Sequence, residues 1–246
     1  MVRTFHHLLV STRPNQHYQD LRGYGADAIG TTDTISLDLL ADDLQVLLHH
    51  LNLTNLHSII GLGLGASIAL TYLDKHATTL HTVRSFVGMD FPLTGSPSLS
   101  GRIMRQRWDE RIALAQRVGM DITGDKAVSR WFSPDARGSE QWQKVRDMAA
   151  AADVDGMIQL ADAVVESVSI RPNHTSIEEI LAGLPVPALF VCGSSDRMLP
   201  EEMEQYPGLM AQAFATYRLI NNAGRMACCE KPEEVAKRLV QAWDMH

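Results

Sequence analysis

Hydrophobic positions along the chain alternate between short apolar runs and segments with helical spacing. The clearest helical segment follows Ser36, where leucines recur every three or four residues, at positions 37, 40, 44, 47, 48 and 51. Acidic residues in its first half suit the positive end of a helix dipole. Short runs at 57–60 and 186–192 predict buried strands, and those at 83–88 and 216–220 predict two further strands. This alternation is typical of an α/β fold with a parallel sheet.

The first 25 residues fit this pattern less well. Residues 4–10 and 17–20 predict two further strands, with a polar stretch containing Pro14 between them. A parallel crossover needs at least about 10–12 residues, and the link here is shorter. We therefore expect a hairpin-like edge or a rebuilt N-terminal region. A third alternative is a partial domain whose exposed edge is covered by a second copy, in a homo-oligomer.

The middle of the chain, from Pro92 to Ile170, has no strand-like run and predicts a helical insertion between two strands of the sheet. It contains three of the four tryptophans: Trp108, Trp131 and Trp142. We accordingly divide the chain into an N-terminal part of an α/β core (1–91), a helical cap (92–184) and the C-terminal part of the core (185–246). Pro232–Trp243 predicts the last helix.

Composition narrows the functional classes. The 246 residues carry 22 Lys+Arg against 29 Asp+Glu, a formal charge of −7, which argues against a nucleic-acid surface. No stretch approaches the ~18–20 apolar residues of a membrane span. Met1–Val10 is too short and too His-rich for a secretory signal. The three cysteines do not suggest a disulfide scaffold, so we expect a cytoplasmic protein with a small-molecule ligand.

Four short motifs resemble, in order along the chain, landmarks of the α/β-hydrolase superfamily. They are Asp20-Leu-Arg-Gly-Tyr-Gly25, Ile60-Gly-Leu-Gly-Leu-Gly65, Val191-Cys-Gly-Ser-Ser-Asp196, and Asn222-Ala-Gly-Arg225 followed by Glu230-Lys-Pro232. In the family, the corresponding segments follow the fourth strand, form the nucleophile elbow, carry the acid and carry the histidine. The cap segment Arg130-Trp-Phe-Ser-Pro134 most resembles 3-oxoadipate enol-lactonases. The resemblance implies an α/β-hydrolase-like, mostly parallel sheet flanked by helices, with a helical cap insertion.

Two catalytic positions of that family are replaced here. The elbow pattern is G-x-S-x-G, but position 63 is Gly, and Arg225 stands where the histidine is expected. Arginine cannot act as a base near neutral pH because its pKa exceeds ~12. Losing a nucleophile or its base typically costs about 10⁶ in kcat. The resemblance therefore implies a degenerate catalytic triad of which only Asp196 remains, as expected of a pseudoenzyme.

The resemblance also nominates the other site residues. Asp196 and Arg225 are expected to approach each other, either as an ion pair that replaces the Asp–His hydrogen bond or with Arg225 clamping a substrate carboxylate. Asp90, at the end of a strand, either matches the alternative acid site of some family members or caps the helical insertion. The shortened N-terminus leaves only the N–H of Leu64 as an oxyanion donor. Gly63, Leu64 and Trp131 are the ligand-binding candidates.

Substitute chemistry finds little support in the sequence. Ser67 and the pair Cys228–Cys229 are better explained by core packing than as nucleophiles. No Cys/His cluster has zinc spacing, so we predict no metal. Gly61–Ala66 also satisfies the dinucleotide fingerprint G-x-G-x-x-G/A, but no acid follows about 20 residues later. We predict no cofactor.

Three functional hypotheses remain. The first is a non-hydrolytic pseudo-hydrolase that binds a partner or a small ligand, such as a carboxylate or lactone; the N-myc downstream-regulated proteins are a precedent. The second is an enzyme with non-serine chemistry of lyase, isomerase or cyclase type on a small lactone, enol or polyketide-like acid. It would use Asp196, Arg225 and Asp90. The third is dinucleotide binding at Gly61–Ala66.

Overall fold

The computed structural model describes residues 8–12, 15–18, 21–22, 35–76, 82–93, 100–170 and 174–243. Within them, a six-stranded sheet has the order β2-β1-β4-β6-β7-β8. Its strands are β1 (Leu8–Thr12), β2 (Asn15–Tyr18), β4 (Ser58–Leu62), β6 (Phe86–Met89), β7 (Ala188–Gly193) and β8 (Ala215–Ile220). The last four run parallel, and β1 is antiparallel to both of its neighbours. The prediction of a mostly parallel sheet is confirmed.

The N-terminal strands form the hairpin-like edge that was one of the expected alternatives. Strands β1 and β2 pair antiparallel, with Thr12 opposite Asn15. Both strands are displaced from their predicted positions, and the motif at 20–25 lies outside the described residues except for Leu21 and Arg22. The predicted strand at 83–88 is wrong in one respect: Val83 belongs to β5 (Thr82–Val83), which pairs with β3 (Asn55–Leu56) in a separate two-stranded sheet.

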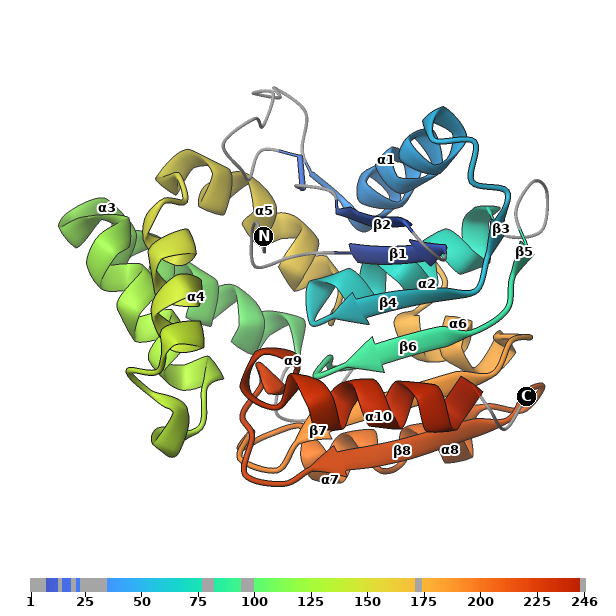
Figure 1. Ribbon diagram of the computed structural model, residues 1–246. Coiled ribbons are helices and arrows are strands. Elements are labelled where there is room, and N and C mark those ends of the chain that lie inside the picture. The colour runs from blue at the N-terminus through green and yellow to red at the C-terminus, as the bar shows by residue number, and fades with distance from the viewer. Residues whose placement is uncertain are drawn as a thin grey trace.

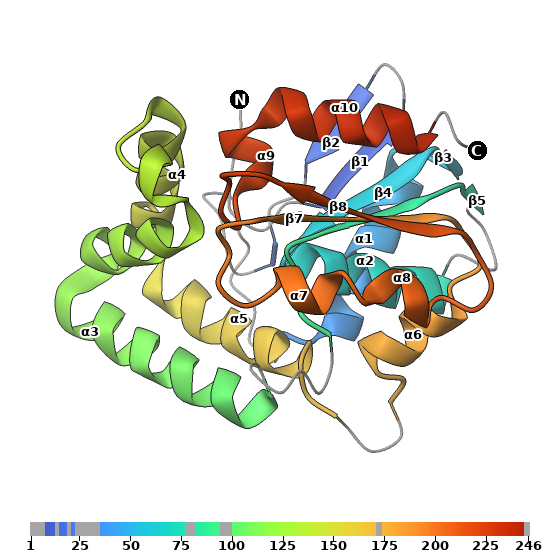
Figure 2. The same cartoon turned by 90° about the horizontal axis from the view of Figure 1, so that it is seen from below.

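Helices cover both faces of the sheet. They are α1 (Leu37–His50), α2 (Leu64–His76), α6 (Ile177–Gly183), α7 (Pro200–Met203), α8 (Tyr206–Leu209), α9 (Ala227–Glu230) and α10 (Pro232–Trp243). Figure 2 shows α10 on one face and α2, α6, α7 and α8 on the other, with α1 beside α2. Helix α1 begins where predicted, because the Ser36 side chain accepts a hydrogen bond from the Leu39 N–H.

Strand residues alternate between the two faces, as the period of a strand requires. Ile59 and Phe190 pack in the core that contains residues of α1 and α2. Their neighbours Ile60 and Val191 pack with Val235 of α10. Strands β4 and β7 are therefore buried on both sides, which explains why they are continuous apolar runs in the sequence.

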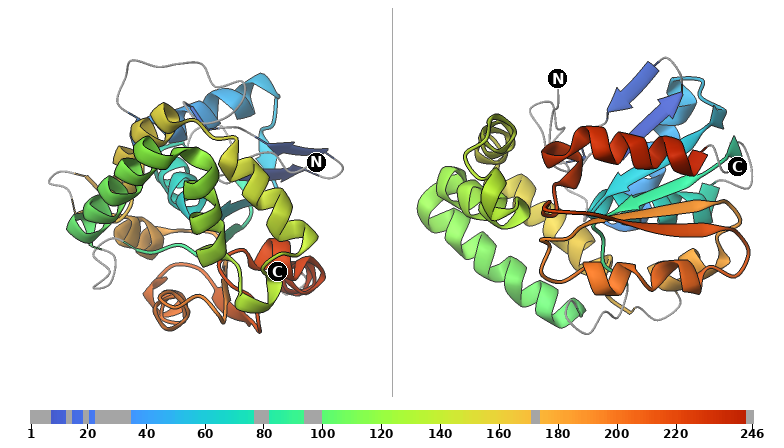
Figure 3. Two further views of the ribbon diagram at one scale, coloured as in Figure 1. Left: turned by 90° about the vertical axis from the view of Figure 1, so that its left-hand side faces the viewer. Right: turned by 60° about the horizontal axis from the view of Figure 1, so that its bottom comes forward.

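The segment between β6 and β7 supplies a helical layer beyond the carboxyl ends of the parallel strands (Figure 1). It contains α3 (Gly101–Trp131), a 3-10 turn (Pro134–Ala136), α4 (Glu140–Ala150) and α5 (Val154–Glu166). Helix α3 is interrupted at Gly119, whose φ of 79° is non-helical, and α4 and α5 pack on it (Figure 3). Among the described residues, no helix combines the length and the apolar character that a bilayer crossing requires.

An aromatic cluster holds the strand ends beneath this layer. Phe91, Phe190 and Tyr206 stack around one another, with ring centroids 5.3 to 6.3 Å apart. The Tyr206 hydroxyl bonds the Phe91 carbonyl at 3.0 Å and the Glu202 carboxylate at 2.9 Å. The chain immediately after Asp90 is thereby fixed in place.

Truncating the cluster should be costly. Phe190 is fully buried, so Phe190→Ala removes a large apolar surface and leaves a cavity. We expect urea unfolding to show a loss of about 3–5 kcal/mol in the free energy of unfolding. The control Val240→Ala, on an exposed face of α10, should change it by less than about 0.5 kcal/mol. Similar losses in both variants would contradict this assignment of the core.

Candidate functional site

The turn between β4 and α2 keeps the geometry of a strand–elbow–helix unit. Gly63 has a φ of +56°, and its N–H donates to the Met89 carbonyl at 2.9 Å. A Cβ at position 61 would lie 2.4 Å from the Cα of Ala66, so only glycine fits there. A Cβ at position 63 would meet nothing within 4 Å. The turn could therefore present a side chain into open space, but none is attached.

Asp196 and Arg225 come together as the sequence predicts. The Arg225 Nε donates to the Asp196 Oδ2 at 2.9 Å. The other carboxylate oxygen accepts the N–H groups of Met198 at 2.9 Å and Leu199 at 3.2 Å. Asp196 is 5% exposed in its side chain and Arg225 33%. The carboxylate is thus fully engaged, while the guanidinium remains partly open.

Asp90 follows β6 in a strained conformation, with a φ of +44°, and is 2% exposed. Its Oδ1 accepts the Gly193 N–H at 3.2 Å and the Cys192 thiol at 3.1 Å. Its Oδ2 is buried with no partner among the described residues. The expectation that Asp90 caps the helical insertion is wrong, because α3 begins at Gly101 after Ser100.

Burial raises the pKa of Asp90 well above its usual value, and the nearby Asp196 raises it further. Hydrogen bonds from Cys192 and Gly193, and the charge of Arg225, lower this pKa but do not reverse the shift. This shift favours the protonated form of Asp90, in which the Oδ2 can donate a hydrogen bond.

One cavity of about 1020 Å³ joins these groups. Its wall contains all six residues nominated from the sequence: Gly63, Leu64, Asp90, Trp131, Asp196 and Arg225. It lies between the carboxyl edge of the sheet and helices α3 and α5. Their roles in binding stay predictions, but the structure gathers them around one space of ligand size.

Sequence reasoning missed the arginines of this cavity. Besides Arg225, the wall carries Arg107, Arg111, Arg130, Arg137 and Arg197, against the acidic residues Asp90, Glu110 and Asp196. Burial, followed by the charges of nearby arginines, lowers the pKa of Arg111 to about 10. The available signal was the four-residue spacing of Arg107 and Arg111, which places both on one helix face.

The cap and the Arg225 loop are bonded to each other. The Met226 N–H donates to the Trp131 carbonyl at 3.2 Å. The Glu230 carboxylate accepts the Gly224 N–H at 2.8 Å and the Ser133 hydroxyl at 2.5 Å. Because Gly224 and Met226 flank Arg225, these bonds fix that residue relative to the cap.

The substitute nucleophiles considered from the sequence are placed differently relative to the cavity. Ser67 is buried in α2, although it also reaches the cavity wall. The hydrogen bond between Cys228 and Cys229, together with burial, raises the pKa of Cys228, whereas the same hydrogen bond lowers the pKa of Cys229. Neither cysteine lines the cavity. Across the part of the chain that the structure describes, no group of three or more His, Cys, Asp or Glu side chains is arranged to hold a metal ion.

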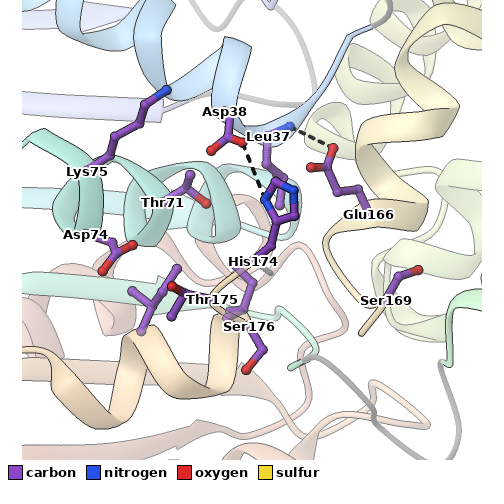
Figure 4. Close-up of a pocket in the computed structure, with 12 residues that line it drawn as sticks. Leu37, Asp38, Thr71, Asp74, Lys75, Glu166, Ser169, His174, Thr175 and Ser176 are labelled. Carbon is purple, nitrogen blue, oxygen red and sulfur yellow. Dashed lines mark hydrogen bonds and ion pairs between the residues drawn. The ribbon is translucent and has the colours of Figure 1, made fainter. Parts of the chain in front are cut away.

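A second, smaller pocket of about 250 Å³ lies between α1, α2 and α6 and has the opposite character (Figure 4). Its polar wall is largely acidic, with Asp38, Asp74 and Glu166. Glu166 accepts the Leu37 N–H at 2.9 Å, and His174 lies 3.9 Å from Asp38. These contacts tie the start of α1 to the end of α5. Among the described residues, no arginine lines this smaller pocket.

Comparisons with known proteins agree with this geometry. Residues 19–232 match the alpha/beta hydrolase fold family. A malate-bound thermophilic esterase from Thermogutta terrifontis aligns with a TM-score of 0.74 at 24% identity, over 91% of this chain and 77% of that chain. The enol-lactonase from Burkholderia xenovorans LB400 gives a TM-score of 0.72 at 20% identity, over 92% and 78%. MenH from S. aureus gives 0.75 at 16%, over 92% and 82%. No curated protein matched the sequence.

The protonation of Asp90 predicts a pH dependence of stability. The unfolded chain releases this proton above its ordinary pKa of 3.8, whereas the folded protein keeps it. The contribution of Asp90 to stability is therefore present at low pH and lost as the pH rises toward the folded pKa. Urea unfolding at pH 5 and pH 8 should show a smaller loss of stability with pH in Asp90→Asn than in the wild type.

An exposed carboxylate on α3 supplies the control. Asp109→Asn should keep the pH dependence of the wild type, because Asp109 is exposed and outside the cavity wall. Identical slopes for Asp90→Asn and the wild type would show that Asp90 is ionised in the folded protein.

Proposed function

Because this chain belongs to the alpha/beta hydrolase fold family but carries Gly63 and Arg225 at the nucleophile and histidine positions, we propose that it binds a small carboxylate without hydrolysing esters. The observation that carries the proposal is the ion pair of Arg225 with Asp196, beside an elbow without a side chain. The ligand occupies the cavity beneath the cap.

The absence of hydrolysis follows from the chemistry of these two positions. Acyl transfer needs a nucleophile and a base that takes its proton. Gly63 has no side chain, and a guanidinium has no lone pair to accept a proton near neutral pH. Asp196 is already saturated by Arg225 and two backbone N–H groups. Its role is to orient a cation.

Three donors of the cavity favour a carboxylate. The Nε of Arg225 is used by Asp196, which leaves the terminal guanidinium nitrogens for a planar anion. The N–H of Leu64 lies in the first turn of α2, where helix N–H groups lack intrahelical partners and favour negative charge. The protonated Asp90 adds a donor that an ionised carboxylate would not provide. The malate-bound esterase offers an example of a carboxylic acid on this fold.

A second candidate function rests on Asp90. A buried, protonated carboxyl with an unpartnered oxygen at a ligand cavity has the features of a general acid. With Arg225 and Asp196 it would act on a small lactone, enol or polyketide-like acid in a lyase, isomerase or cyclase reaction. Turnover that is lost in Asp90→Asn and Asp196→Asn would favour this candidate over simple binding. Membership of the alpha/beta hydrolase fold family does not support the third hypothesis, dinucleotide binding at Gly61–Ala66. The acid expected about 20 residues after that motif is also missing.

The wild type should neither cleave p-nitrophenyl acetate nor be labelled by a fluorophosphonate, because both reactions need an activated hydroxyl. The double variant Gly63→Ser/Arg225→His restores the two missing groups. The serine stands on a turn that already has a positive φ and free space for a side chain. We expect intact-mass spectrometry to show stoichiometric labelling of the double variant alone. Labelling of the wild type would reveal a nucleophile and overturn the proposal.

Ligand binding can be measured by thermal shift and calorimetry. A panel of small carboxylates, each with its uncharged amide, should stabilise the protein only in the charged form, since bound ligand raises the unfolding temperature by mass action. Arg225→Gln should weaken binding by about ten-fold or more, or about 1.4 kcal/mol. The control Arg84→Gln removes an exposed arginine outside the cavity and should bind as the wild type does. Equal responses to acids and amides would contradict a carboxylate site.

A further inference from the structure

Three arginines of α3 line the cavity without an acidic partner. Two other described arginines of the cap do form salt bridges: Arg105 contacts Asp162, and Arg146 of α4 contacts Asp121. For Arg107, Arg111 and Arg130, no carboxylate of the described residues lies within salt-bridge distance. Within the described residues no salt bridge therefore neutralises their charge, although the charge of Glu110 raises the pKa of Arg111.

The environment makes this lack of compensation costly. Arg107 and Arg111 are only partly exposed, and the Arg111 guanidinium lies 5.5 Å from the centre of the Trp108 ring. Partial burial of a cation disfavours it unless a counter-charge is nearby. Burial is the largest cause that lowers the pKa of Arg111. The charges of Arg130, Arg225 and Arg107 lower this pKa further, and the charge of Glu110 opposes the shift. An anion bound among these arginines would relieve the repulsion.

The charges of Arg111 and Arg130 interact with the charge of Arg225. Partial burial and the charge of Arg225 both lower the pKa of Arg130. Yet Arg225 enters from the loop after β8, whereas Arg107 and Arg111 lie in the first half of α3. The cavity of about 1020 Å³ is far larger than one carboxylate and spans from the sheet edge to α3. Two positive subsites thus face a single ligand-sized space.

We propose that the ligand is a small dianion, with one anionic group on Arg225 and the second on Arg107, Arg111 and Arg130. The inference rests on the proposed function, because it takes the first carboxylate as held at Arg225. It adds that the second group is a carboxylate or a phosphate-type anion, both of which accept several guanidinium hydrogen bonds. The spacing between the two groups is set by the distance from the sheet edge to α3.

Calorimetry with matched acids tests the second subsite. The probes are monocarboxylates and dicarboxylates of equal chain length: butyrate with succinate, hexanoate with adipate, and octanoate with suberate. We expect at least one dicarboxylate to bind about ten-fold or more tightly than its monocarboxylate partner. A further probe, 3-phosphonopropionate, replaces one carboxylate of succinate. Tighter binding of the phosphonate would assign a phosphate-type second group, and weaker binding a carboxylate.

Charge-removing variants locate the subsite. Arg111→Gln should weaken dianion binding by about ten-fold, and by more than it weakens binding of the matched monoanion. Arg130→Gln, at a more exposed position, should have the same direction of effect and remains informative if Arg111→Gln folds poorly. Arg117→Gln is the matched control, because Arg117 is exposed on α3 and does not line the cavity. It should bind both probes as the wild type does.

If these arginines only stabilised the fold, Arg111→Gln would lower the melting temperature of the ligand-free protein. The proposal predicts a different result. Without ligand, Arg111→Gln should melt no lower than the wild type, since the substitution removes repulsion between like charges. The proposal is overturned if no dianion binds more tightly than its monoanion partner, or if Arg111→Gln and Arg130→Gln weaken both probes equally. In either case, retained monoanion binding leaves the carboxylate site at Arg225 standing. If the wild type bound none of the probes, both the dianion proposal and the carboxylate site at Arg225 would be wrong.

Discussion

The ion pair between Asp196 and Arg225 determines the character of the cavity. The loop after β7 supplies the acid, and the loop after β8 supplies the cation. In a hydrolase of this fold, the same position holds a histidine whose neutral form takes a proton. Here the Asp196 carboxylate holds a permanent charge in place. The protein therefore retains an acid that orients its partner, and this partner is a guanidinium, which favours anions and does not accept a proton near neutral pH.

Three other features of the cavity surround that charge. Asp90 is buried between the ends of β6 and β7, and its neighbour Asp196 disfavours a second negative charge. The elbow at Gly63 leaves open space where a nucleophile would stand. Opposite these groups, α3 contributes arginines that form no salt bridge within the described residues. The result is a positive wall in a chain whose net charge is −7, so the distribution of charge matters more for ligand choice than its total.

Much of the fold could be predicted from the sequence because local patterns specify it. Strands buried on both faces appear as continuous apolar runs, and Ser36 marks the start of α1. The pairing of Val83 was missed because an apolar residue carries no information about which strand it joins. The hairpin of β1 and β2 was one of several alternatives, since its short link excludes a parallel crossover but does not exclude a rebuilt edge.

The sequence by itself determined which chemical groups are missing, because a side chain absent at position 63 and a guanidinium at position 225 are facts of covalent structure. The order of its motifs also indicated that Asp196 would meet Arg225. Only the tertiary structure decided that Asp90 is buried, which raises its pKa, and that Arg107, Arg111 and Arg130 share a cavity with Arg225. Burial and the distance between charges arise from packing between segments far apart in the chain, and no local pattern of residues encodes them.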